Sequence, residues 1–245
     1  MTERKTTDKD RESLPPQEYA LIVAGGKGTR FGSRIPKQFH ELSGRPILLH
    51  TLDAFLRYSP TIRLVVVLPK EDIAAWNEIR EKHRYSAPVE VVTGGVTRFQ
   101  SVKNGLENIP ENALVAIHDG VRPLVSTRMI ATSFALARIH GSAVASLPLK
   151  ESLRLITEGE PAPLESTAVD RSLYRIIQTP QTFQAGVIRK AYAVGEDETL
   201  TDDASVAERS GSKICLFEGD PVNIKITHPE DLIMAEALLS RQSGL

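Results

Sequence analysis

A glycine-rich turn followed by basic residues is the part of this sequence best suited to chemistry on phosphates. The turn is Ala24-Gly25-Gly26-Lys27-Gly28-Thr29-Arg30, and Pro36-Lys37-Gln38 follows shortly after it. Glycines let backbone N–H groups approach a ligand closely, and consecutive N–H groups form a cradle for anions. The cations Arg30 and Lys37 suit a polyphosphate, whose leaving group gains negative charge during phosphoryl or nucleotidyl transfer.

Neither of the two best-known phosphate-loop patterns fits this turn. Gly26 and Gly28 satisfy the start of the dinucleotide fingerprint G-x-G-x-x-G, but Phe31 takes the place of its third glycine. The P-loop requires Ser or Thr directly after Gly-Lys, whereas Gly28 follows Gly26-Lys27. The complete string instead resembles the nucleotidyltransferase signature G-G-x-G-x-R followed by P-K.

Two further motifs indicate a nucleotide site. Gly94-Gly95, followed by Arg98 and Ser101, forms a second glycine turn that could read the edge of a base. His118–Pro123 comes at the end of an apolar run, where the Asp119 carboxylate can face Mg²⁺ and phosphate. Both motifs therefore follow expected strands, as the first turn does.

Two other groups of charged residues invite a functional interpretation. Lys225 lies between apolar neighbours before the last expected helix, so the pattern predicts a functional lysine on a strand. Asp202 and Asp203 look like an acid/base pair, but side chains of consecutive residues point in different directions on regular structure. Thr201 before them favours the start of a helix, with acids near its positive end.

Short apolar runs alternate with helical patterns and must position these groups. The expected strands are 19–23, 64–68, 89–93, 114–118, 143–149 and 213–217. The expected helices lie near 48–56, 72–83 and 126–140, and a last helix begins at Thr227 and Glu230, which have capping-box spacing. This alternation predicts an α/β fold with a mostly parallel, Rossmann-like sheet covered by helices.

One stretch breaks the alternation. Residues 152–156 alternate polar and apolar side chains, 159–163 have the composition of a turn, and 166–169 look extended again. The pattern predicts an inserted β-hairpin arm at about 151–175, with too few apolar residues for a core of its own. Because isolated hairpins are only marginally stable in water, the arm is expected to pack on its own domain or on a second subunit.

The composition is that of an ordinary globular protein. Of 245 residues, 41% are hydrophobic and 25% are charged, and the net charge of −1 gives no basic excess for a nucleic-acid partner. The single cysteine excludes an internal disulfide, and no apolar run approaches the length of a membrane span. We expect a cytoplasmic protein with no membrane partner, a flexible charged tail at 1–18 and a single domain at 19–240.

In their order along the chain, these motifs resemble the 2-C-methyl-D-erythritol 4-phosphate cytidylyltransferases of the non-mevalonate isoprenoid pathway. The resemblance includes Gln178–Phe183 and Thr201–Ala204, and it extends from about Tyr19 to Leu239. It implies a nucleotidyltransferase fold, a homodimer, and transfer of the cytidylyl group of CTP to methylerythritol phosphate with release of pyrophosphate. Mg²⁺ is the implied cofactor, and the substrate phosphate is the implied nucleophile.

The resemblance also implies roles for individual residues. Arg30, Lys37, Lys225 and Arg171 would be catalytic, with Arg30 and Lys37 stabilising the charge at the α-phosphate. The residues implied to contact the nucleotide are Ala24, Gly25, Gly26, Gly28, Gly95, Ser101, Asp119 and Gly120. The residues implied to bind the acceptor are Ser152, Arg171, Lys225, Asp119 and Arg122. Ser152 and Arg171 would reach the neighbouring subunit's site from the arm, and Asp119 would also contact the metal.

The chain departs from the family pattern in two places. Gly120-Val121 stands where two alanines are common, and Ser152 stands where a threonine is more usual. The serine keeps a hydroxyl, so a hydrogen bond to substrate survives. The Gly-Val change leaves an alternative open, a ribitol 5-phosphate cytidylyltransferase with the same fold and the same CTP donor.

Overall fold

A computed structural model describes residues 16–26, 31, 35–158 and 165–243 of the chain. Its strands are β1 (Glu18–Val23), β2 (Glu41–Leu42), β3 (Arg45–Pro46), β4 (Arg63–Leu68), β5 (Val89–Thr93), β6 (Leu114–Asp119), β7 (Ser142–Pro148), β8 (Arg154–Glu158), β9 (Glu165–Ala168), β10 (Arg175–Gln184) and β11 (Leu216–Glu218). Its helices are α1 (Ile47–Tyr58), α2 (Ile73–Lys82), α3 (Arg98–Leu106), α4 (Thr127–His140), α5 (Ala185–Tyr192), α6 (Asp203–Arg209) and α7 (Pro229–Ser243), with 3₁₀ turns η2 (Lys37–Phe39), η3 (Lys70–Asp72) and η4 (Arg171–Leu173).

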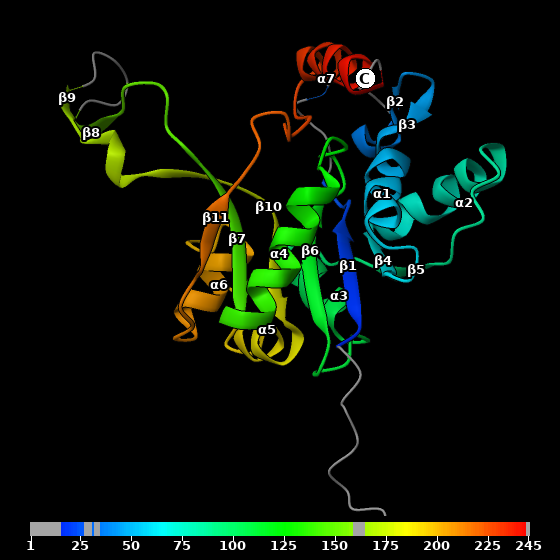
Figure 1. Cartoon of the computed structure of the whole chain (residues 1–245), viewed down its shortest axis with the longest axis horizontal. Coiled ribbons are helices and arrows are strands. Elements are labelled where there is room, and N and C mark those ends of the chain that lie inside the picture. Colours follow the sequence, from blue (N-terminus) through cyan, green and yellow to red (C-terminus); the bar gives the residue numbers. More distant parts are fainter. Residues whose placement is uncertain (1–15, 27–30, 32–34, 159–164, 244–245) are drawn as a thin grey trace, which may run out of the picture.

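The centre of the molecule is a seven-stranded sheet in the order β11-β7-β10-β6-β1-β4-β5 (Figure 1). Strand β1 pairs in parallel with β4 and β6, β4 pairs in parallel with β5, and β11 pairs in parallel with β7. Among the described strands of this sheet, β10 alone runs antiparallel to its two neighbours, β6 and β7. The prediction of a mostly parallel α/β sheet is therefore confirmed.

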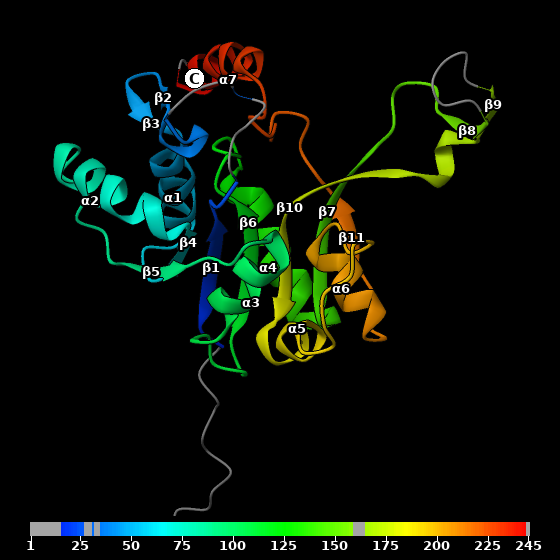
Figure 2. The ribbon, with the colours of Figure 1, turned by 180° about the vertical axis from the view of Figure 1, so that it is seen from behind.

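Helices cover both faces of this sheet, which explains why its central strands β1, β4 and β6 consist mainly of apolar residues. On β1, Ala20 and Ile22 pack in one buried cluster with residues of α1, α2 and α4, on the face seen in Figure 1. Leu21 packs in a second cluster with residues of α3, α5 and α6, on the face seen in Figure 2. Side chains alternate across a strand, so a strand buried on both faces needs apolar residues at every position.

The sheet order places the functional loops together. The chain passes from β1 outward to β4 and β5, and it then returns to form β6 on the other side of β1. Val23 at the end of β1 lies in register with Asp119 at the end of β6. Such a reversal of strand order is where open α/β sheets bind ligands, because the loops after the two strands diverge and leave a crevice.

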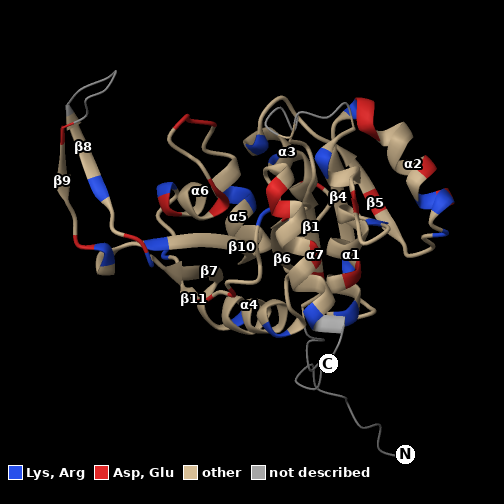
Figure 3. Cartoon of the chain, turned by 90° about the horizontal axis from the view of Figure 1, so that it is seen from above, with Lys and Arg blue, Asp and Glu red and all other residues tan. Residues whose placement is uncertain are grey.

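The arm predicted from the sequence is present. Strands β8 and β9 form a separate two-stranded antiparallel sheet, and the turn predicted at 159–163 lies outside the described residues. Figure 1 shows the arm projecting away from the body of the molecule, and Figure 3 shows it at the end opposite to α2. Leu155, Ile156 and Leu173 on the arm are 59%, 49% and 79% exposed, so this chain alone does not bury them.

The sequence pattern did not predict the long strand β10. β10 contains Gln178, Thr179 and Pro180 in its middle, with a cis peptide bond before Pro180 and a register shift between Ile177 and Gln181. Polar residues and a proline hide the strand pattern, since proline donates no hydrogen bond to a neighbouring strand. The structure buries these polar side chains and gives them partners, as described below.

Near the C-terminus the structure corrects three predictions. The strand predicted at 213–217 is shorter and begins at Leu216, and Lys225 lies in a loop rather than on a strand. The capping-box prediction for Thr227 and Glu230 was wrong. Instead Asp231 accepts hydrogen bonds from the backbone N–H groups of Thr227 (2.7 Å) and His228 (2.8 Å), just before α7. None of the helices in the described part of the chain is long and apolar enough to cross a membrane.

Candidate active site

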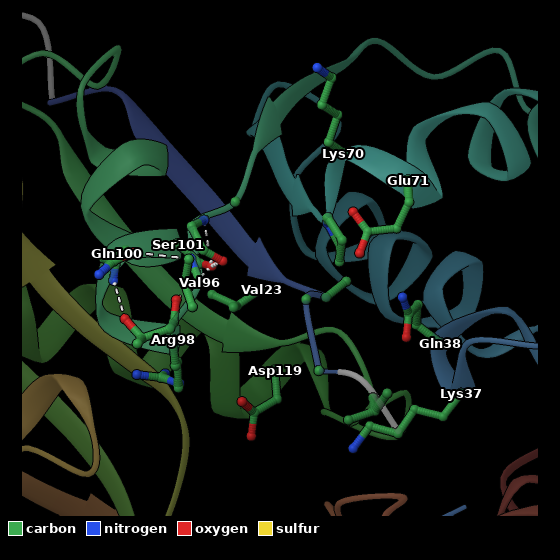
Figure 4. Close-up of a pocket in the computed structure, with 18 of the residues that line it drawn as sticks. Val23, Lys37, Gln38, Lys70, Glu71, Val96, Arg98, Gln100, Ser101 and Asp119 are labelled. Carbon is green, nitrogen blue, oxygen red and sulfur yellow. Dashed lines mark hydrogen bonds between the residues drawn. The ribbon is translucent and has the colours of Figure 1, made fainter. Parts of the chain in front are cut away.

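A cavity of about 640 Å³ opens at the carboxyl ends of β1, β4, β5 and β6 (Figure 4). It is lined by Val23, Ala24, Gly25, Gly26, Lys37, Gln38, Pro69, Lys70, Glu71, Gly94, Gly95, Val96, Thr97, Arg98, Gln100, Ser101, Asp119, Val121 and Lys225. Six separate segments of the chain therefore contribute, and most of them follow a strand or begin a helix at this edge of the sheet.

The first glycine turn forms one wall of the cavity. Ala24 is anchored to the adjacent strand, because its backbone N–H donates to the Val67 carbonyl at 3.0 Å. A Cβ atom on Gly26 would lie 3.7 Å from Cε of Lys37, and a Cβ on Gly25 would lie 3.8 Å from Oγ of Ser101. The glycine turn is thus packed between the lysine on one side and the second glycine turn on the other.

The second glycine turn is held by the start of α3. Ser101 Oγ accepts from the Gly95 N–H at 3.1 Å and donates to the Thr97 carbonyl at 2.8 Å. The side-chain oxygen of Gln100 accepts from the Val96 N–H at 3.0 Å. A Cβ on Gly95 would lie only 2.3 Å from Cβ of Gln100, so only glycine fits there. The turn has a fixed backbone edge, which suits recognition of a flat base.

A buried carboxylate and two cations form the third part of the site. Oδ2 of Asp119 lies 3.0 Å from Nζ of Lys225 and 3.2 Å from Nε of Arg122, and Arg122 also donates to the Asn223 carbonyl at 2.8 Å. Burial alone would raise the pKa of Asp119, but the charges of Lys225, Arg98 and Arg122 outweigh burial and hold that pKa well below its ordinary value. Asp119 is therefore an anion that fixes Lys225 at the cavity.

Behind Asp119, a fully buried histidine completes a chain of hydrogen bonds. Thr179 Oγ1 accepts from the Asp119 N–H at 3.1 Å and lies 3.0 Å from Nδ1 of His118, whose Nε2 lies 3.1 Å from the Arg122 carbonyl. A carbonyl only accepts, so Nε2 carries the proton and Thr179 donates to Nδ1. Burial lowers the pKa of His118 to about 4, which keeps the imidazole neutral.

This buried histidine predicts a loss of stability in mild acid. The unfolded chain protonates His118 near its ordinary pKa of 6.5, whereas the folded protein does so only near pH 4. Between these values the unfolded state binds more protons, so the free energy of unfolding falls as the pH falls. We expect a loss of about 2 kcal/mol between pH 7.5 and pH 5, measured by urea unfolding at each pH. His118→Gln should lose less over the same interval, and an equal loss would assign the effect to other groups.

The two consecutive aspartates have structural partners. Asp202 is the N-cap of α6, and its side chain accepts a hydrogen bond from the Ser205 N–H. This contact supports the helix start predicted at this place, with the N-cap one residue after Thr201. Asp203 is fully buried, with Oδ1 and Oδ2 accepting from Arg98 at 2.9 and 2.7 Å. Tyr192 donates a further hydrogen bond to Asp203 at 2.6 Å. These contacts favour the structural interpretation over an acid/base pair.

The structure brings together most of the residues predicted for the nucleotide. The predicted residues that line the cavity are Ala24, Gly25, Gly26, Lys37, Gly95, Ser101, Asp119 and Lys225. Gly28 and Arg30 lie outside the described residues. Gly120 and Arg122 lie behind the cavity wall, and a Cβ on Gly120 would lie 2.9 Å from Cβ of Ala24.

The two predicted arm residues are not brought to the cavity of their own chain. Ser152 and Arg171 are exposed and lie on the arm, outside the cavity lining. A guanidinium nitrogen of Arg171 donates to the backbone carbonyl of Lys150, which holds the side chain against the base of the arm. Their predicted role therefore depends on a second molecule.

Sequence reasoning missed several residues of the cavity wall. Pro69, Lys70 and Glu71 follow β4, and Gln38 follows Lys37, yet none of them was named as a candidate. A signal was available for the first group, because the chain after a strand next to β1 must emerge at the same edge of a parallel sheet. The strand at 64–68 was predicted, but the residues directly after it were not predicted to line the site.

A glycine cradle at a switch point, with Lys37 beside it and Lys225 held by an ionised carboxylate, is an arrangement for binding and cleaving a nucleoside triphosphate. The fold and the site thus define a nucleotidyltransferase. Comparison with known proteins gives the family: residues 19–241 match the family model described as IspD, 2-C-methyl-D-erythritol 4-phosphate cytidylyltransferase. The chain belongs to this family.

Individual relatives agree with the family model. A 2-C-methyl-D-erythritol 4-phosphate cytidylyltransferase of Porphyromonas gingivalis is 46% identical and covers 93% of this chain and 100% of the relative. One of Bacteroides thetaiotaomicron is 42% identical over 91% of this chain and 100% of the relative. The crystal structure of 4-diphosphocytidyl-2C-methyl-D-erythritol synthase from Anaerococcus prevotii is similar with a TM-score of 0.76 at 28% identity, covering 92% of this chain and 97% of that one.

Proposed function

We propose that this protein transfers the cytidylyl group of CTP to 2-C-methyl-D-erythritol 4-phosphate and releases pyrophosphate. The observation that carries the proposal is the cavity in which the glycine turn after β1 meets Lys37 and the Asp119–Lys225 pair, in a chain of this family. The names of the relatives favour this acceptor over ribitol 5-phosphate, the alternative raised by Gly120-Val121.

The reaction needs no covalent intermediate with the enzyme. A phosphate oxygen of the acceptor attacks the α-phosphorus of CTP, a new P–O bond forms, and the bond between the α-phosphorus and the bridging oxygen breaks on the opposite side. The electron pair of that bond leaves with pyrophosphate. Positioning and charge stabilisation therefore account for catalysis, since both reactants and the leaving group are anions.

Each wall of the cavity supports one part of this reaction. Backbone N–H groups of Gly25 and Gly26 would hold the triphosphate, and Nζ of Lys37, which lies beside this turn, would stabilise negative charge at the α-phosphate. The backbone edge at Gly95, fixed by Ser101, would bind the cytosine. Lys225, aimed into the cavity by Asp119, would bind the acceptor phosphate.

The site also fits a divalent cation. Mg²⁺ in phosphate-transfer sites is bound by one or two carboxylates together with substrate phosphates. Asp119 is a buried carboxylate in the cavity, kept ionised by its neighbours, and the described Lys225 and Arg122 both contact its Oδ2, so Oδ1 would coordinate the metal. Within the described ranges no cluster of three metal-binding side chains occurs, so the phosphates of CTP would supply the other ligands. When bound, Mg²⁺ would neutralise part of the triphosphate charge.

The arm supports a homodimer in which each subunit completes the other's site. Leu155 and Ile156 are exposed on β8 of a two-stranded sheet that is too small to be stable alone, and Leu173 is exposed on the adjoining turn η4, so a second copy of the chain would cover them. Ser152 and Arg171 lie on this arm, away from their own cavity. In the dimer they would reach the acceptor in the partner's cavity.

We expect Arg171→Ala to weaken use of the acceptor and to leave CTP binding nearly unchanged. A guanidinium contacts a phosphate through charge-assisted hydrogen bonds, and losing one such contact costs about 1.5–3 kcal/mol. Steady-state kinetics would measure KM for methylerythritol phosphate, and calorimetry would measure CTP affinity. Arg154→Ala is a suitable control, because Arg154 is on the same arm but is bound to Ser166. A collapse of CTP affinity in Arg171→Ala would contradict the assignment.

The proposed activity is tested by incubating the protein with CTP, Mg²⁺ and one acceptor at a time. Pyrophosphate release with methylerythritol phosphate, and little with ribitol 5-phosphate, is the expected result. UTP and GTP in place of CTP test the base. Release with ribitol 5-phosphate alone would select the alternative acceptor, and no release with either would refute the proposal.

A further inference from the structure

The turn that carries Lys37 is too short to fix its own position. η2 contains three residues and is closed by two backbone bonds, from Phe39 N–H to the Pro36 carbonyl and from His40 N–H to the Lys37 carbonyl. Short 3₁₀ segments of this kind have little stability of their own, so contacts with the rest of the protein set their place. Phe39 is one such contact, because it is buried in the core with α1 and α2.

Gln38 provides the second contact, and it is a polar one. Its side chain is 1% exposed, and Nε2 donates to Oδ2 of Asp72 at 3.0 Å. The acceptor is a carboxylate, so the hydrogen bond is charge-assisted and stronger than one between neutral groups. Figure 4 shows Gln38 next to Lys37 on one wall of the cavity, with Glu71 on the adjoining segment.

Asp72 is placed to serve this contact. It ends η3 and stands at the N-cap of α2, where an aspartate ordinarily accepts a backbone N–H of the helix, but its side chain makes no capping hydrogen bond. Its carboxylate instead points to Gln38, from a different segment of the chain. Its backbone N–H donates to the Pro69 carbonyl at 3.0 Å, so Asp72 is fixed to the end of β4.

We propose that Gln38 is a positioning residue that, through Asp72, fixes Lys37 against the glycine turn. The bond between Gln38 and Asp72 connects η2, which carries Lys37, to η3, which follows β4. With the bond intact, Cε of Lys37 stays 3.7 Å from the position of a Cβ on Gly26. The inference rests on the proposed function for its effect on turnover.

The test begins with Gln38→Met, which keeps the length of the side chain and removes the donor. A displacement of a charge-stabilising group by about 1 Å can cost about 100-fold in rate, so we expect kcat to fall about 10- to 100-fold with KM for CTP nearly unchanged. Asp72→Ala should behave alike, and Asp72→Asn, which keeps an acceptor oxygen, should restore most of kcat. Loss of kcat in Asp72→Asn equal to that in Asp72→Ala would overturn the inference.

Two further variants separate positioning from general stability. Gln181 is also 1% exposed and donates to an aspartate, Asp202, at 2.9 Å, but it lies outside the cavity lining. Gln181→Met should lower the melting temperature at least as much as Gln38→Met, with kcat unchanged. In a Lys37→Ala background, Gln38→Met should have no further effect on kcat. An equal loss of kcat in the control, or a second full loss in the Lys37→Ala background, would refute a role through Lys37.

A readout without turnover distinguishes this inference from the proposed function. The rate at which an amine-reactive ester acylates Lys37 can be followed by mass spectrometry of the protein with no substrate present. Gln38→Met should change this rate and Gln181→Met should not. An unchanged rate refutes the positioning role even if the enzyme is active. A changed rate in a protein that releases no pyrophosphate supports positioning and refutes only the proposed reaction.

Discussion

Replacing Lys37 by alanine is expected to lower kcat about 100- to 1,000-fold, the range found when a single charge-stabilising donor is removed from an enzyme. The physical reason is its location: Lys37 lines the cavity, and its Cε lies 3.7 Å from the place of a Cβ on Gly26, beside the turn expected to hold the triphosphate. Its contribution is expected to be larger in the transition state, where charge accumulates at the α-phosphate and the leaving pyrophosphate.

The measurement is pyrophosphate release at saturating CTP and acceptor, together with a thermal unfolding curve. Unfolding should change little, because Lys37 is only half-buried at the cavity. Lys82→Ala is the control, since Lys82 is 67% exposed and pairs with Glu41 on the outer surface. Lys37→Arg should recover part of the activity by restoring the charge. An unchanged kcat in Lys37→Ala would mean that the lysine has no role in the transition state.

Replacing Asp119 by asparagine is expected to damage stability and turnover together. The substitution keeps the shape of the side chain but leaves Lys225 and Arg122 facing a neutral group. Breaking a buried ion pair by removing one partner costs about 3–5 kcal/mol. Lys225 is 42% exposed and can turn to solvent, and Arg122 keeps the Asn223 carbonyl, so we expect a loss at or just below the lower end of that range, about 2–3 kcal/mol. Lys225 is then no longer held at the cavity, and we expect kcat/KM for the acceptor to fall about 100-fold.

Urea unfolding at neutral pH and steady-state kinetics measure the two effects. Glu218→Gln is the matched control, because it neutralises an ion pair of 2.7 Å in which the carboxylate is 67% exposed, and such pairs contribute about 0–1 kcal/mol. In the double variant Asp119→Asn/Lys225→Met, removal of the uncompensated cation should recover part of the lost stability. Full activity in Asp119→Asn would exclude both the metal role and the positioning of Lys225.

Most of the sheet could be predicted because local sequence determines it. Residues 20–23 of β1, 64–68 of β4 and 114–117 of β6 are continuous apolar runs, as burial on both faces demands, and these strands were predicted within one residue. β10 could not be predicted in this way. Its buried Gln178, Thr179 and Gln181 are polar, and they are stable there only because distant loops supply hydrogen-bond partners, such as the Asp220 carbonyl for Gln178.

The residues of the candidate site also divide into those that the local sequence predicts and those that depend on distant contacts. The glycine turns and Asp119 were identified because each follows a recognisable strand, and a glycine or a carboxylate there has few structural explanations. The partnership of Lys225 with Asp119, and that of Gln38 with Asp72, join segments that are distant in sequence. The sequence gives the two residue types of such a contact, but it does not show that the two side chains lie close together in the fold. The resemblance to a family supplied part of this information for Lys225 and none for Gln38.

The way the arm leaves the sheet has a consequence for the evolution and engineering of this protein. β7 ends at Pro148 and β10 begins at Arg175, and these two residues are antiparallel neighbours in register. The arm is therefore a modular insertion between adjacent strand ends, and a tight turn joining them would excise it without altering the topology of the sheet. The length of the arm can therefore change without disturbing the paired strands of the sheet, as long as Ser152 and Arg171 keep their places on it.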